Sequence, residues 1–119
     1  MGIFDKFIGK KKSSKLATPL LDKKYLGLIG LEFGMYLTWV EDTTKKSIMG
    51  KELERRIKMF LQKEKKLGHI QDFNNSDVMH INMLAMACDI KTMQQERKKN
   101  NLDGRWPQME EHIGLKKNL

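Results

Sequence analysis

Residues 18–41 read TPLLDKKYLGLIGLEFGMYLTWVE, and this stretch decides the fold of the chain. Thr18 can cap a helix, and Pro19 fits the first helical position, where no backbone N–H is needed for an intrahelical bond. From Leu21 onward, apolar residues recur at helical spacing on nearly every side. Such a pattern is typical of the central helix of a bundle, and we predict a helix over about 19–41.

Three glycines lie on one side of this predicted helix, at Gly27, Gly30 and Gly34. Small residues in such a row let a neighbouring backbone approach closely, although each glycine costs about 1 kcal/mol of helix propensity. That cost, together with the β-favouring residues from Tyr36 to Val40, leaves an alternative open. If 31–40 is a strand, the fold is α+β.

Two further long helices follow from capping and stop signals. Ser47 can cap the second helix, which Gly68 would end, and Asn75 or Ser76 can cap the third. A short C-terminal helix should begin at Trp106 and reach about Ile113. The predicted fold is therefore all-α: a small bundle of three principal helices over about 19–41, 48–67 and 77–99, with a short C-terminal helix.

The 119 residues can bury one modest core. We expect a basic N-terminal arm at 1–17, flexible or docked to a partner, a single helical domain at 18–113 and a C-terminal tail at 114–119. Cys88 is the only cysteine, which excludes an intramolecular disulfide, and the N-terminus does not resemble a secretory signal. These features predict a cytoplasmic protein.

The basic residues of the predicted second helix gather opposite its apolar arc. The chain carries 23 Lys and Arg against 15 Asp and Glu, a formal net charge of +8, which favours anionic partners. An ordinary solvated face, with nearby glutamates forming ion pairs, is the simplest interpretation, and a phosphate-binding face is the alternative. The candidate anion-binding residues are Lys51, Arg55, Arg56, Lys58, Lys65 and Lys66, with Lys10, Lys11, Lys12 and Lys15 of the arm.

Residues 3–15 also fit a weak membrane-surface anchor. Ile3, Phe4, Phe7 and Ile8 share one side of a short helix, and the basic run follows directly. Apolar insertion and attraction to anionic lipid would add together. A disordered or partner-docked tail is the simpler interpretation of the same residues.

The predicted third helix carries a methionine seam with steps of four, three, four and three residues: Met79, Met83, Met86, Ile90 and Met93. Thioethers fill irregular cores and also form adaptable surfaces for partner helices, and core packing is the commoner use. Trp106 should likewise clamp the C-terminal segment onto the bundle or onto a partner. These six residues are the candidate protein interface.

The residues capable of chemistry are scattered. His69, His80, His112 and Cys88 form neither a paired cysteine motif nor a helical histidine pair. His80 and Cys88 would stand about 12 Å apart along one helix, too far for proton transfer. We predict no catalytic residue, no metal, no cofactor and no small-molecule substrate.

Together these observations predict a non-enzymatic helical adaptor or structural subunit of a larger assembly, which binds a protein partner or a second copy of itself. The alternative function is sequence-independent nucleic-acid binding through the basic helix face, because that helix lacks the interspersed Asn and Gln that read bases. A peripheral protein of anionic membrane surfaces is the third hypothesis.

Overall fold

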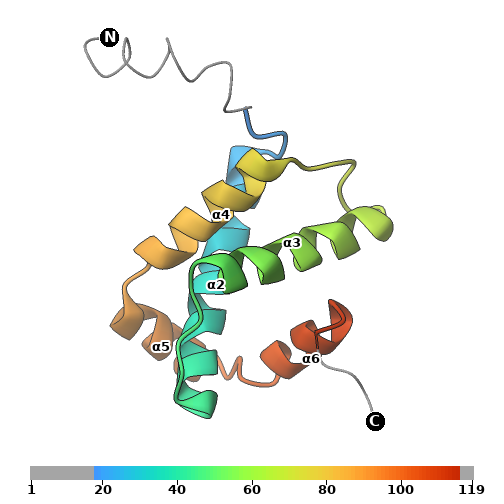
Figure 1. The fold of residues 1–119 in the computed structure, drawn as a ribbon. Helices are drawn as coiled ribbons and strands as arrows, with labels where there is room; N and C mark the ends of the chain where they lie inside the picture. Colours follow the sequence, from blue (N-terminus) through green and yellow to red (C-terminus); the bar gives the residue numbers. More distant parts are fainter. Residues whose placement is uncertain (1–17, 116–119) are drawn as a thin grey trace, which may run out of the picture.

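The structure, a computed structural model, describes residues 18–115. These residues form five α-helices: α2 (Lys23–Thr44), α3 (Lys51–Lys66), α4 (Asn75–Ala87), α5 (Ile90–Lys99) and α6 (Arg105–His112) (Figure 1). The predicted all-α fold is confirmed. Residues 31–40 lie inside α2, and residues 18–115 contain no strand, so the α+β alternative is wrong. The arm at 1–17, with its lysines and its apolar edge, lies outside the described residues.

Helix α2 runs through the middle of the molecule (Figure 1). Helices α4 and α5 lie along one side of it, α3 crosses it, and α6 lies on the other side. Helix α2 contacts both α4 and α5, and α3 also contacts α4. The apolar character of α2 on most of its sides thus reflects neighbours on several sides.

The core is built where α2, α3 and α4 meet, and Trp106 of α6 closes it. In α3 the buried residues step by four positions, which places them on one stripe facing the core. The most deeply buried apolar members of the core are Leu26, Phe33, Tyr36, Val40, Leu53, Ile57, Leu61, Val78, Ile81, Ala85 and Trp106.

The first two helices begin later than the sequence predicts. Helix α2 starts after Asp22, whose carboxylate accepts a hydrogen bond from the Lys24 backbone N–H at 3.0 Å. Asp is a better N-cap than Thr, which explains why Thr18 and Pro19 precede the helix instead of opening it. Helix α3 is preceded by Gly50, at a φ of 60°, rather than capped by Ser47.

The single helix predicted over 77–99 is wrong, because the chain breaks at Cys88 and Asp89 into α4 and α5. Cys88 is extended, with a ψ of 143°, and the Asp89 carboxylate caps α5 by accepting from the Thr92 backbone N–H at 2.9 Å. The turn brings Arg97 of α5 onto α2, where it bonds to Asp42. This tertiary contact outweighs the helical continuity that the sequence suggests.

The glycine row of α2 lets α4 pack closely at two of its three positions. A Cβ atom at Gly30 would lie 2.6 Å from the Cβ of Leu84, and one at Gly34 would lie 2.6 Å from the Sγ of Cys88. Gly27 has no heavy atom of a neighbour within 4 Å of that position. The predicted close approach is therefore confirmed for Gly30 and Gly34 but not for Gly27.

Candidate protein-binding surface

Three methionines of α4 point away from the core and form what we call the methionine face: Met79, Met83 and Met86. Their exposed fractions are 47%, 64% and 46%. Val78, Ile81 and Ala85 occupy the opposite arc of the same helix and are buried. Core packing, the favoured interpretation of the seam, is therefore wrong for these three methionines.

The other members of the predicted interface divide between core and surface. Met93 is buried because α5 turns back onto α2, whereas Ile90 at the start of α5 is exposed. Trp106 is 1% exposed and packs beside Tyr36, with 6.1 Å between ring centroids. Its burial removes Trp106 from any surface interface.

The solvent-facing side of α4 carries no Lys, Arg, Asp or Glu. The only such residue in the helix is Asp77, which is fully buried. Asp77 completes the capping box with Asn74, and its Oδ1 also accepts the Leu21 backbone N–H at 3.0 Å. In a chain that is 32% charged, this helix face is thus both apolar and neutral.

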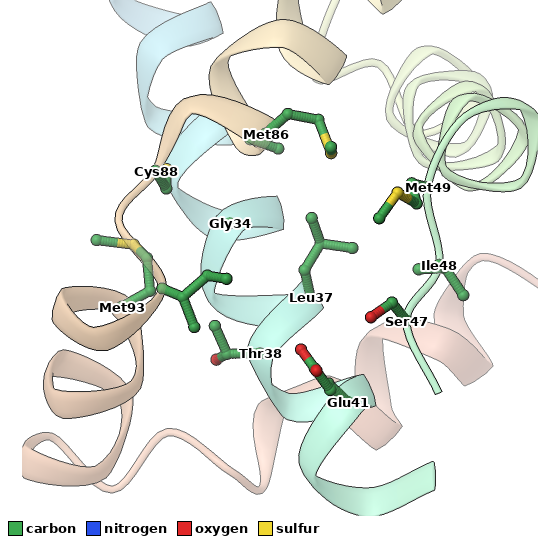
Figure 2. A pocket seen from close by; sticks show the side chains of 12 residues that line it. Gly34, Leu37, Thr38, Glu41, Ser47, Ile48, Met49, Met86, Cys88 and Met93 are labelled. Atoms are coloured by element: carbon green, nitrogen blue, oxygen red, sulfur yellow. The ribbon is translucent and has the colours of Figure 1, made fainter. Parts of the chain in front are cut away.

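The methionine face continues into a small groove of about 100 Å³ at the junction of α4 and α5. Figure 2 shows Met49 and Met86 on opposite walls, with Leu37 between them and Met93 on the α5 side. Met49 is exposed, and Glu41 and Ser47 lie at one end. Met86 belongs to both features, so face and groove form one continuous surface, which we call the docking surface.

The basic face predicted on α3 is only partly available. The sequence predicts Arg56 on the exposed basic face, but its guanidinium packs inward. Its Nη1 donates to Tyr36 Oη at 2.6 Å, and its Nε donates to Glu52 Oε2 at 2.6 Å. The Tyr36 hydroxyl in turn donates to Glu110 Oε2 of α6 at 2.6 Å. Burial, followed by the hydrogen bond to Glu110, raises the pKa of Tyr36. The Arg56 guanidinium is thus held in a network of hydrogen bonds that links α2, α3 and α6.

Two further basic side chains of α3 already have acidic partners. Arg55 Nη2 lies 3.0 Å from Glu52 Oε2, and Lys65 Nζ lies 3.0 Å from Asp72 Oδ1. Lys51, Lys58 and Lys66 are exposed and have no ion pair within residues 18–115. The lysines at positions 10, 11, 12 and 15 lie outside this part of the chain.

Three lysines follow one flank of α3 at seven-residue spacing, and we call them the lysine row: Lys51, Lys58 and Lys65. Arg56 marks the flank that faces α6, and Lys58 lies about 200° around the helix from it. Lys65 reaches Asp72, two residues before the cap of α4. The lysine row therefore lies on the flank of α3 away from the one that faces α6, and α3 itself contacts α4.

The surroundings of Cys88 do not favour a reactive thiol. The Cys88 thiol donates to the Leu84 carbonyl oxygen at 3.3 Å, and burial raises the pKa of Cys88, which disfavours the nucleophilic thiolate. Residues 18–115 contain no group of three His, Cys, Asp or Glu side chains able to hold a metal ion.

A second hollow, of about 730 Å³, lies between α2, α3 and α6. Phe33, Phe60 and Met109 contribute apolar walls, and an ion pair between Arg105 and Glu32 lines it as well. Burial raises the pKa of Glu32, and the neighbouring Arg105 opposes that shift. The Glu32 carboxylate is thus already bound to a guanidinium, and the exposed imidazole of His112 also lines the hollow.

Within residues 18–115 no helix has the length and apolar character needed to cross a bilayer. Comparison of the chain with family models, with curated proteins and with solved structures found no match. The function is therefore inferred from the geometry of the docking surface.

Proposed function

We propose that this chain is a non-enzymatic helical adaptor or structural subunit that binds a protein partner through the docking surface. One observation carries the proposal: the outer side of α4 presents three exposed methionines and no charged side chain, although its inner side is firmly packed on α2. Contiguous exposed apolar residues on a folded protein mark interaction sites. Flexible thioethers also suit a surface that adapts to a partner.

Site-specific photo-crosslinking in the source cells tests this proposal. A photoreactive phenylalanine analogue would replace Met83 in the full chain, and the same analogue at Glu111, exposed on α6, would serve as the control. We expect a discrete protein adduct from position 83 only. That adduct should disappear when Met79 and Met86 are both changed to Glu, because charge on the face would oppose apolar docking.

Two results would contradict the proposal. Position 83 could give no adduct, or it could give the same adducts as position 111, which would indicate random collision. Circular dichroism of the double variant checks that the fold survives, as expected for substitutions at half-exposed positions.

Nucleic-acid binding is the second candidate function, and the unpaired Lys51, Lys58 and Lys66 of α3 favour it. These side chains could contact phosphates without reading bases. It ranks second because the inward Arg56 and the paired Arg55 and Lys65 reduce the free positive charge of the helix.

A further inference from the structure

The docking surface on α4 and the lysine row on the neighbouring helix α3 offer two different chemistries. Met79, Met83 and Met86 follow the i, i+4, i+7 spacing of a helix stripe, over a helix of 13 residues that is about 20 Å long. Helix α3 contacts α4, and the helical wheel places the lysine row on its flank away from α6, with members about 10.5 Å apart along the axis. A ligand that matches both must offer an apolar stripe and negative charge at helical spacing.

We propose that the partner segment is an acidic amphipathic helix, which packs its apolar stripe on the methionine face and directs its carboxylates to the lysine row. The inference rests on the proposed function and names the partner's chemistry. Helices that pack in a groove use i, i+3, i+4 and i+7 anchors, and neighbouring helix axes lie about 8–10 Å apart. At that separation, carboxylates on one flank of the partner reach the lysines of α3.

Charge complementarity favours an acidic helix over a basic helix or a second copy of this chain. Lys51 and Lys58 lack an acidic partner within residues 18–115, and the exposed pair between Lys65 and Asp72 can open at little cost. Nothing on the neutral face of α4 repels an acidic helix. A basic helix would meet the lysine row, and a second copy of this chain would bring a second lysine row to the same interface.

The test uses the full chain and three synthetic peptides of about five helical turns. The first is an acidic amphipathic helix with a leucine stripe and glutamates, the second replaces every glutamate by lysine, and the third has the first composition in an order without a stripe. Backbone amide shifts and fluorescence anisotropy would report binding from low to high salt. Generic peptides suffice, because methionine surfaces accept helices of varied sequence.

We expect the acidic amphipathic peptide alone to bind, to shift the amides of α4 and to bind less tightly as salt rises. The double variant K51E/K58E should bind it about tenfold less tightly, since two favourable charge contacts become repulsive. Met83→Glu should lose binding. The charge-matched control K91E/K99E, at exposed positions of α5, should bind as the unmodified chain does.

Other outcomes separate this inference from the proposed function. Equal binding of the acidic and basic amphipathic peptides, or no peptide binding while position 83 still crosslinks to a protein, would overturn the acidic helix and leave the adaptor function standing. Binding of duplex DNA or anionic vesicles that K51E/K58E abolishes, without binding of the acidic peptide, would overturn it too. In that case the lysine row serves a different class of anion.

Discussion

Arg97 is the most deeply buried cation of the described residues, with an exposed fraction of 1%. Its Nη2 lies 2.5 Å from Asp42 Oδ2 on α2, its Nε lies 2.9 Å from Asp103 Oδ1, and Nη1 donates to Thr38 Oγ1 at 3.1 Å. A buried charge is tolerated only when it is paired and hydrogen-bonded. Asp42 and Thr38, both on α2, therefore fix the position of α5 on that helix, and Asp103 in the loop after α5 adds a second carboxylate beside the buried charge.

This pairing predicts how stability depends on pH. The hydrogen bond from Arg97 is the largest cause that lowers the pKa of Asp42, so the native state binds the proton less tightly than the unfolded chain does. The stabilisation is complete above the unfolded pKa of about 3.9 and is lost as pH falls through the folded value. Urea unfolding at a series of pH values should show a free energy of unfolding that falls below about pH 4.

Asp42→Asn should flatten this acid-side slope, because the group that takes up the proton is gone. Asp72→Asn is the matched control: its pKa is also lowered, first by the hydrogen bond from Lys65, but the carboxylate is exposed. We expect a smaller change of slope in this control. An acid-side slope in Asp42→Asn equal to that of the unmodified chain would contradict the prediction.

Arg56 is a residue whose side-chain position the sequence does not predict. The basic character of α3 predicts a solvent-facing anion-binding role for it, although Arg56 lies about 200° around the helix from Lys58. Its partners Tyr36 and Glu110 lie 20 and 54 residues away in the chain, and no sequence pattern close to Arg56 predicts these contacts. The inward position of Arg56 is thus a property of the tertiary structure alone.

At the scale of helices, the contact between α2 and α4 makes a sharp prediction about the glycines. Alanine at Gly30 or Gly34 would place a Cβ atom 2.6 Å from Leu84 or Cys88, and the helices would have to separate. We expect each substitution to destabilise the fold by about 1–3 kcal/mol, despite the better helix propensity of alanine. The midpoint of urea unfolding measures the change.

Gly27→Ala is the matched control in the same helix, because no neighbouring heavy atom lies within 4 Å of the added Cβ position. It should stabilise the protein by up to about 1 kcal/mol through helix propensity. Similar effects of alanine at all three positions would show that close approach of α4 does not set the requirement for glycine.

The helices also show how far the sequence could predict the fold. The bundle, the central helix and the short helix at Trp106 follow from periodicity and capping residues, which are local signals. The break at Cys88 and Asp89 has no glycine or proline to mark it, and only the capping ability of Asp89 hints at it. Because the sequence gives little sign of this break, it places all four methionines in one seam. In the structure Met93 is buried, whereas Met79, Met83 and Met86 face solvent.

At the scale of the whole molecule, the formal charge of +8 favours anionic ligands, yet the structure limits what α3 can contribute. Each phosphate neutralised on duplex DNA steepens the dependence of log affinity on log salt by about 0.9. Three basic side chains of α3 are exposed without an ion pair inside residues 18–115: Lys51, Lys58 and Lys66. The partly exposed Lys63 also has no ion pair in this part of the chain, so helix α3 should account for a slope of no more than about 4.

Binding to duplex DNA across a salt series, with and without the changes K51Q, R55Q, K58Q and K65Q, measures this contribution. If the chain is an adaptor, only Lys51 and Lys58 of these four are free to bind phosphate, so the changes should lower the slope by about 2 or less, and any affinity should vanish at moderate salt. A steeper slope that collapses in the variant would mean that the ion pairs of Arg55 and Lys65 open on binding. The basic side of α3 would then be a phosphate-binding face, and nucleic-acid binding would replace the adaptor as the leading function, because the same lysines cannot hold a phosphate backbone and an acidic helix at once.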